Sequence, residues 1–324
     1  MNFHFGEASK ILLKTTPYLL IRTAIYGVLG IAIALYLGFV LLIGKVFGGG
    51  GAIFFIIGLA VLVGLLQMAK RYALYLVDAG HIAVITELIK NGSLPEGINQ
   101  FQYGKELVTR MFKEVSVLFV VDRLVDGIIR VFNRTVVQVT DFLPLPGIEG
   151  VAKIANSIIN FSLTYVDETI LSYNLARGDE NIWESAKRGI ILYAQNWKPI
   201  LITGVGCAAT NFLAFVVVFL VLLIPFGVFS MMTANQTLKL FWFGVALSLA
   251  YGIKLALFKP FFQTSMILTF NEAIAGQVPN REWEERLDMA SDKFRELKEK
   301  AADYVSSRTA PGPVAPAPAP ETVP

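Results

Sequence analysis

Charged and amide side chains recur at helical spacing through residues 115–176, a stretch with the length of a membrane hairpin. Arginines in this stretch could select anionic groups, and aspartates could act as counter-charges or proton carriers. Ionisable residues at bilayer depth are costly and by default mark a function. The candidate residues that would line a solute or ion path are Asp122, Asp126, Arg130, Arg134, Gln138, Lys153, Asn156, Asn160, Thr164 and Asp167.

The spacing of these side chains decides how they face one another. In the first segment, Val115–Leu143, they recur every four residues, so the stripe drifts slowly around a helix of about 3.6 residues per turn. In the second segment, Val151–Ala176, intervals of three and four keep them on one face. The turn Pro144–Gly147 would end one helix and reverse the chain. Asp126 also has the favourable acid-first i,i+4 spacing to Arg130.

Three interpretations of this polar hairpin remain open. In the first, it spans the bilayer and lines a path inside a monomer or an oligomer. In the second, it spans, but its polar faces form a satisfied structural seam. In the third, both helices lie at the cytoplasmic interface with the polar face toward water, as amphipathic interfacial helices do. Each charge at mid-bilayer costs at least about 2.5 kcal/mol on insertion scales, so either spanning interpretation requires a partner for every charge.

Composition places the chain in a membrane. Of its 324 residues, 55% are hydrophobic and only 16% are charged, and the mean hydropathy is +0.59. Soluble domains hold about 25% charged residues. Apolar runs of roughly 20 residues match the hydrocarbon core, which is about 30 Å thick. The clear transmembrane segments are Tyr18–Ile43, Ala52–Met68, Ile200–Ile224 and Leu238–Phe258.

We therefore predict an all-α polytopic membrane protein with three helical hairpins, which comprise four clear transmembrane helices and two polar or amphipathic ones. Interfacial amphipathic helices precede the hairpins, in a weak repeat of about 90 residues. The predicted sections are an amphipathic N-terminal helix with the first hairpin (1–68), cytoplasmic or interfacial helices (69–114), the polar hairpin (115–176), an interfacial helix with the last hairpin (177–258), cytoplasmic helices (259–305) and a disordered Pro/Ala-rich tail (306–324).

Basic residues set the predicted orientation. Lysine and arginine cluster at the ends of the apolar segments that lie away from the short turns. The positive-inside rule then puts both termini in the cytoplasm of what we expect to be a prokaryotic cytoplasmic membrane. Arg22 would reach the interface by snorkelling, and Lys254 and Lys259 would act as positive-inside anchors. Asp167–Glu168 is interpreted as part of an acidic cytoplasmic cluster near Arg177.

Sequence motifs of known enzymes are missing. The chain lacks GxSxG, P-loop, HExxH and Gly-rich dinucleotide sequences, so we predict no enzymatic activity and no cofactor. A net charge of only +3 gives no reason to expect nucleic-acid binding. The single cysteine, Cys207, cannot form an intrachain disulfide or a cysteine metal cluster, and we interpret it as a packing residue.

Short elements between residues 103 and 181 are similar to the choline transporter-like family. They are Tyr103–Gly104–Lys105, Val139–Thr140–Asp141–Phe142–Leu143, Val166–Asp167 and Arg177–Gly178–Asp179. Members of that family have these elements in a similar order around membrane helices, and the resemblance implies uptake of choline-like amines. The chain departs from the family by continuing into another apolar hairpin where such transporters end.

These patterns together predict an integral membrane protein in which the polar hairpin lines a channel- or transporter-like path for a small solute or ion. The alternative is a non-transporting scaffold or assembly subunit whose middle hairpin lies on the cytoplasmic interface. The expected partners are the lipid bilayer, a small solute or ion, and further copies of the chain, because self-association would satisfy the charges of the stripe.

Overall fold

The computed structural model describes residues 3–47, 57, 58, 61, 64, 74–112, 115–136 and 165–309, and regular secondary structure in these ranges is helical throughout. The predicted apolar segment Ala52–Met68 falls mostly outside them, and the Pro144–Gly147 turn entirely. The helices are α1 (Phe5–Lys14), α2 (Thr16–Phe47), α4 (Tyr75–Asn91), α5 (Gln100–Phe112), α6 (Val115–Val136), α8 (Val166–Arg177), α9 (Ile182–Gln195), α10 (Trp197–Met231), α11 (Gln236–Ile253), the π-turn η5 (Lys254–Phe258), α12 (Lys259–Ile274), α13 (Arg281–Ala290) and α14 (Asp292–Thr309).

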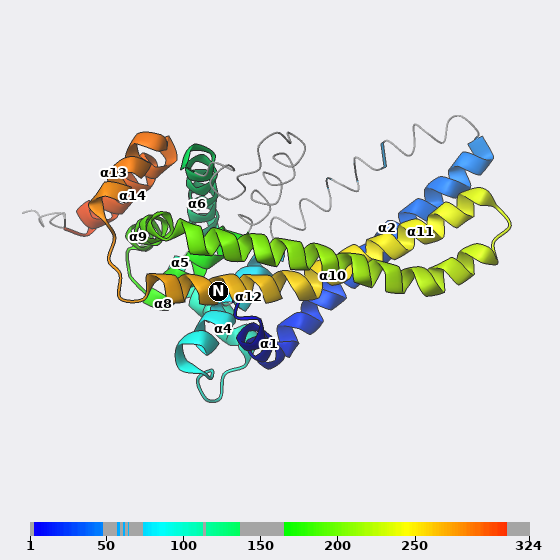
Figure 1. The fold of residues 1–324 in the computed structure, drawn as a ribbon, viewed down its shortest axis with the longest axis horizontal. Coiled ribbons are helices and arrows are strands. Elements are labelled where there is room, and N and C mark those ends of the chain that lie inside the picture. Colours follow the sequence, from blue (N-terminus) through cyan, green and yellow to red (C-terminus); the bar gives the residue numbers. More distant parts are fainter. Residues whose placement is uncertain are drawn as a thin grey trace, which may run out of the picture.

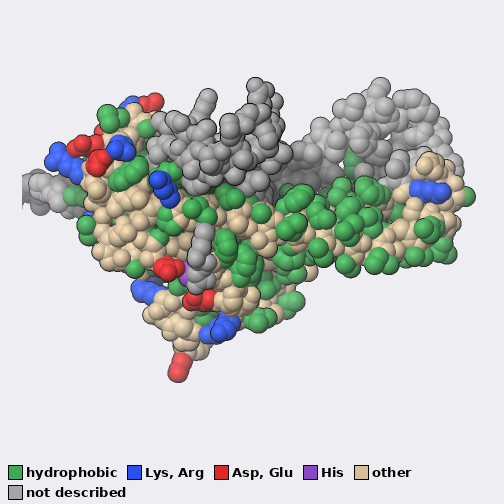
Figure 2. All heavy atoms as spheres, viewed as in Figure 1, with side chains coloured by type: hydrophobic (Ala, Val, Ile, Leu, Met, Phe, Trp, Pro, Cys, Tyr) green, Lys and Arg blue, Asp and Glu red, His purple; other side chains and the backbone are tan. Residues whose placement is uncertain are grey.

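Three long helices project from a cluster of shorter ones, which we call the head (Figure 1). The projecting helices, which we call the rod, are α2, α10 and α11, and α11 packs against both of the others. The head gathers α1, α4, α5, α6, α8, α9, α12, α13 and α14. In the face that Figure 2 shows, hydrophobic side chains cover the rod, and most of the charged side chains lie on the head.

The rod has the composition of a membrane-spanning unit. From Phe212 to Met231, large apolar residues of α10 are exposed around the helix, among them Leu213, Leu220 and Ile224. A helix that is apolar all round belongs in a core or in lipid, and a segment of about 20 residues is about 30 Å long, the thickness of a bilayer core. Three described segments are long and apolar enough to cross a membrane: Thr16–Ile33, Trp197–Met231 and Phe241–Ile274.

Two of these helices continue from the rod into the head. The first part of α10 is buried there, including Ile200, Leu201 and Cys207. At the end of α11 the π-turn η5 leads directly into α12, whose Phe262 and Phe270 are almost fully buried. The two helices therefore belong to the membrane unit at one end and to the core of the head at the other, which ties the two parts together.

The centre of the head consists of isoleucines and an aromatic side chain from four helices. Ile82 of α4, Ile170 of α8, Ile190 of α9 and Phe270 of α12 are each at most 2% exposed and belong to one hydrophobic cluster. One polar pair lies at this depth: the hydroxyl oxygens of Thr86 and Ser172 are 2.7 Å apart between α4 and α8. The predicted all-α class is confirmed for the described part of the chain, and the finer arrangement of three hairpins stays a prediction.

The first segment of the polar hairpin forms α6, and this helix packs among helices of the head. Its apolar face buries Val121, Val125 and Ile128. Its neighbours are α5, α8, α9 and the charged helices α13 and α14, and it is not one of the three candidate spans. At the C-terminus, α14 continues to Thr309, so residues 306–309 are helical, whereas the sequence predicted a disordered tail from residue 306.

Candidate functional site: a charged cavity between rod and head

The structure separates the residues of the predicted polar stripe. Asp122 and Asp167 line one cavity. Asp126 and Arg130 form the expected i,i+4 ion pair, with 2.8 Å between Oδ1 and Nε, but the arginine side chain is 73% exposed. Arg134 lies near the end of α6. The remaining candidates fall outside the described residues: Gln138, Lys153, Asn156, Asn160 and Thr164.

The cavity that holds Asp122 and Asp167 has a volume of about 350 Å³ and lies where α11 meets the head. We call it the junction cavity. Helices α4, α6 and α8 of the head contribute the carboxyl groups, whereas η5 and α12 contribute one lysine each. Its lining residues are Tyr26, Leu74, Tyr75, Asp78, Ala79, Ile82, Asp122, Tyr165, Asp167, Glu168, Leu171, Asn211, Tyr251, Lys254, Leu255 and Lys259.

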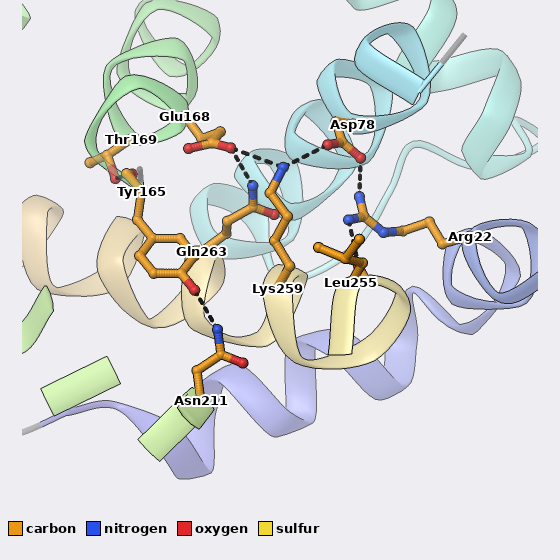
Figure 3. Close-up of polar contacts among 9 residues, drawn as sticks. All are labelled: Arg22, Asp78, Tyr165, Glu168, Thr169, Asn211, Leu255, Lys259 and Gln263. Atoms are coloured by element: carbon orange, nitrogen blue, oxygen red, sulfur yellow. Dashed lines mark hydrogen bonds and ion pairs between the residues drawn. The ribbon is translucent and has the colours of Figure 1, made fainter. Parts of the chain in front are cut away.

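A chain of ion pairs runs along the wall of the junction cavity (Figure 3). The Arg22 guanidinium of α2 binds the Asp78 carboxylate and donates a 3.1 Å hydrogen bond to the Leu255 carbonyl. The Lys259 Nζ lies 2.9 Å from Asp78 Oδ2 and 3.3 Å from Glu168 Oε1. The network therefore connects α2 and α12, which lie in candidate spans, to α4 and α8 of the head.

Glu168 and Asp78 each have close polar partners. Gln263 Nε2 donates a 2.6 Å hydrogen bond to Glu168 Oε1, the oxygen that also faces Lys259. Burial acts to raise the pKa of Asp78, but Lys259 and Arg22 outweigh that effect and hold this pKa below its usual value. A buried charge is tolerated only when it is paired and hydrogen-bonded, and both of these carboxylates meet that condition.

Asp122 and Asp167 differ from those two carboxylates, since they have no ion pair with any described residue closer than 4.0 Å. Burial raises the pKa of Asp122 to about 7, and the nearby carboxylates of Glu168 and Asp126 add to the rise. Burial also raises the pKa of Asp167 well above its usual value, reinforced by the charge of Glu168 and a hydrogen bond with it. These two acids therefore hold protons more readily than ordinary aspartates.

Three acceptor oxygens of the cavity lining lack a hydrogen-bond donor: Asp167 Oδ1, Glu168 Oε2 and Asn211 Oδ1. Asn211 is 1% exposed, and its Nδ2 donates a 2.9 Å hydrogen bond to the Tyr165 hydroxyl, whereas its Oδ1 accepts no hydrogen bond. Most buried polar atoms in proteins have a partner. All three oxygens are buried beneath the surface of the cavity, and the side chains of Asp167 and Glu168 share a hydrogen bond.

Within the described ranges, no three His, Cys, Asp or Glu side chains are grouped so that they could hold a metal ion. Four tyrosines line the walls between the charged groups: Tyr26, Tyr75, Tyr165 and Tyr251. Their rings give the cavity apolar surface beside its carboxylates, a combination that suits a small organic molecule with a charged end.

Two interpretations of basic residues from the sequence are wrong. Arg22 does not snorkel to an interface, because it is 1% exposed and pairs with Asp78 across 56 residues of sequence. Lys259 is not simply an anchor at a membrane boundary, because two carboxylates surround its ammonium group. Asp78 itself was not singled out, although an aspartate within the apolar run Tyr75–Ile85 is a sequence signal for a buried ionic partner.

Comparisons of the chain with family models, with curated proteins and with solved structures find no match. The resemblance to the choline transporter-like family therefore stays a prediction. Of the residues that carry it, Tyr103 donates a 2.6 Å hydrogen bond to Glu87, Asp167 lines the junction cavity, and Arg177 pairs with Asp179 at 2.6 Å. The element Val139–Leu143 lies outside the described residues.

Proposed function

We propose that this protein is an integral membrane protein of channel or transporter type, in which the junction cavity receives a small charged solute. The observation that carries the proposal is the pair of carboxyl groups, Asp122 and Asp167, that face one cavity without a basic partner among the described residues. Burying ionisable side chains at the edge of a membrane domain costs free energy, so such side chains mark candidate functional sites.

The position of the cavity supports a role at the membrane. Tyr251 lies near the end of α11 and Lys254 is the first residue of η5. Tyr251 is 51% exposed, so the cavity lies next to the apolar surface of the rod. Its opposite wall belongs to the head. A solute held there would sit at the boundary between the apolar rod and the charged head, which we place on the cytoplasmic side because of the positive-inside rule.

The contributions of the polar stripe to such a path are unequal. Asp122 and Asp167 line the cavity and would contact the solute. Arg130 is on the surface and pairs with Asp126, so we assign no solute contact to this arginine. The selectivity of the path would therefore come from carboxylates rather than from Arg130, and the solute would be a cation.

A second candidate function is that of a scaffold or assembly subunit. One observation favours it: α6 packs against α9, α13 and α14 within the head, which agrees with a middle section that lies on the cytoplasmic face. In that case the ionic network would serve only to join rod and head, and no solute would pass.

Flux through reconstituted protein separates the two candidates. We would measure swelling of proteoliposomes in the chlorides of sodium, methylammonium and choline, and in sodium acetate. The proposal expects cation entry that falls at least tenfold in Asp167→Asn. The exposed carboxylate of Asp303 supplies the matched control, and Asp303→Asn should behave as wild type. Entry of none of these ions, in protein that retains its helical circular dichroism spectrum, would favour the scaffold.

A further inference from the structure

The ion pairs on the wall of the junction cavity balance one another without the two other acids of the lining. Two cations and two carboxylates form these pairs: Arg22, Lys259, Asp78 and Glu168. Asp122 and Asp167 line the same cavity but have no ion pair with any described residue within 4.0 Å. An ionised carboxylate at either position would therefore add a charge that these pairs do not compensate.

The side chains of Asp167 and Glu168 are hydrogen-bonded to each other. An ionised carboxylate has only acceptor oxygens, so a hydrogen bond between two carboxyl groups requires a proton on one of them. Glu168 is stabilised as the anion, because Lys259 Nζ lies 3.3 Å from its Oε1 and Gln263 donates a 2.6 Å hydrogen bond to the same oxygen. The proton of this pair therefore belongs to Asp167.

The surroundings of Asp167 show what holds this proton. The titratable and charged side chains that act on Asp167 are Tyr75, Asp122, Arg130, Glu168 and Lys259. Burial and then the acids raise the pKa of Asp167, and Lys259 acts against them. The charged side chains of α5, α9, α13 and α14, which pack on α6, have contacts of their own, among them Glu106, Lys187, Arg188, Glu284, Lys293 and Lys298. A cation in the cavity would offset the neighbouring acids and so weaken the hold on the proton.

The charge of the cavity indicates how many protons a cation would replace. Lys254 is the remaining cation of the lining. Asp122 is ionised above pH 7 and then balances this lysine, because burial raises its pKa to about 7 and no higher. The site is thus neutral at pH 8 when Asp167 holds its proton. Entry of a monovalent cation adds one positive charge, and release of the Asp167 proton removes one.

We infer that the proton shared by Asp167 and Glu168 leaves when a cation enters the junction cavity, so that the protein exchanges one proton for each monovalent cation. The inference rests on the proposed role of this cavity as a cation site and adds the ion to which cation movement is coupled. The O–H bond of Asp167 breaks, its electron pair stays on the carboxylate, and the proton passes to water. The cation then compensates the new carboxylate in place of the proton.

Infrared difference spectroscopy tests the displacement without any need for transport. We would expose the full-length protein in detergent at pH 8 to sodium chloride and to choline chloride, since neither cation carries an exchangeable charge. At least one salt should reduce the absorbance of protonated carboxyl groups in the wild type and in Asp303→Asn, and neither should do so in Asp167→Asn. No loss in the wild type, or the same loss in a folded Asp167→Asn protein, would overturn the inference.

A second variant covers the case in which Asp167→Asn does not fold. In Glu168→Gln the amide can donate a hydrogen bond to an ionised Asp167, so the shared proton is no longer required. The salt-sensitive carboxyl absorbance should therefore disappear in this variant as well. Its persistence in folded Glu168→Gln protein would contradict the assignment of the proton to this pair.

Proteoliposomes that contain a fluorescent pH indicator test the coupling. Equal potassium on both sides with valinomycin holds the membrane potential at zero, and a gradient of sodium or choline chloride is applied from outside. The pH of the lumen should rise in the wild type and in Asp303→Asn but not in Asp167→Asn. Cation entry without a rise in pH would overturn the exchange and leave the transport proposal intact. If the salts displace the proton in the infrared spectra but no cation enters, the transport proposal fails and the displacement at Asp167 stands.

Discussion

Arg22 of α2 forms an ion pair with Asp78 of α4, although only 1% of the arginine is exposed. The same carboxylate binds Lys259 of α12 at 2.9 Å, so one aspartate joins two cations that both lie in candidate membrane spans. Burying these charges has a large desolvation cost, which is offset only when the ion pairs have good geometry. The ionic network therefore holds α2 and α12 against α4 and α8 of the head. The junction cavity lies between these helices.

The first prediction concerns the strength of this network. Arg22→Met leaves part of the Asp78 charge uncompensated in a buried place, and we expect it to lower the free energy of unfolding by about 3 kcal/mol. Chemical denaturation in detergent micelles would measure the change. The matched control is Arg286→Met, which removes an exposed arginine 2.6 Å from Glu282 and should cost less than about 1 kcal/mol. Losses of equal size would show that the buried pair has no special role.

The second prediction concerns Asp122 and alkaline pH. The groups around this carboxyl are Tyr75, Asp126, Glu168 and Lys259, and burial with the two acids raises its pKa to about 7. The folded protein thus binds this proton more tightly than the unfolded chain, in which the pKa is about 4. The resulting stability is fully present below pH 4 and is lost as the pH rises through 7.

Asp122→Asn removes that titration while keeping an oxygen that can accept from Tyr75. We therefore expect the melting temperature of the wild type to fall more steeply from pH 5 to pH 8 than that of the variant. Asp303→Asn, which changes an exposed acid, should follow the wild-type curve. Parallel curves for the wild type and Asp122→Asn would contradict the prediction.

The third prediction concerns His81, whose contribution to stability changes with pH in the opposite direction to that of Asp122. Its ring stacks on Tyr18 and lies 2.9 Å from Thr15 Oγ1, and burial lowers its pKa to about 3. Because the unfolded chain takes up the proton near pH 6.5, the stability that this group contributes is present above pH 6.5. It is lost as the pH falls toward 3, by about 1.4 kcal/mol per pH unit.

The variant His81→Gln isolates this effect, because a glutamine amide can still bond Thr15 and does not titrate. Denaturant titrations at pH 7, 6, 5 and 4 should show that the stability difference between the wild type and the variant shrinks with acidification. A difference that stays constant over this range would mean that His81 is already protonated in the folded protein or that it titrates like an exposed histidine.

The sequence was sufficient to predict features that depend on neighbours along the chain. Apolar composition on all sides of α2, α10 and α11 was enough to predict membrane helices, and the four-residue spacing of Asp126 and Arg130 predicted their ion pair. Ion pairs between distant segments could not be predicted in this way. Lys259 and Asp78 are 181 residues apart, and only the packing of the head makes them neighbours.

The difference between local spacing and tertiary packing also explains why only part of the predicted polar stripe lines the cavity. A helical repeat tells which side chains share a face of α6, but it does not tell what that face meets. Asp122 faces the junction cavity, whereas Arg130, two turns further along, is exposed. The slow drift of a four-residue repeat around the helix separates these side chains, so a single stripe in the sequence becomes one cavity residue and one surface pair.

The last prediction concerns the side of the membrane on which α6 lies. In a Cys207→Ala background, we would introduce single exposed cysteines in the head as Glu96→Cys, Arg130→Cys and Glu299→Cys, and one between α10 and α11 as Ala234→Cys. Because α6 packs within the head and the α10–α11 connection lies at the far end of the rod (Figure 1), an impermeant maleimide should label the three head positions from one side of the membrane and Ala234→Cys from the other. Labelling of Arg130→Cys from the side of Ala234→Cys would place α6 across the bilayer, and the head would then have to be divided between the two sides.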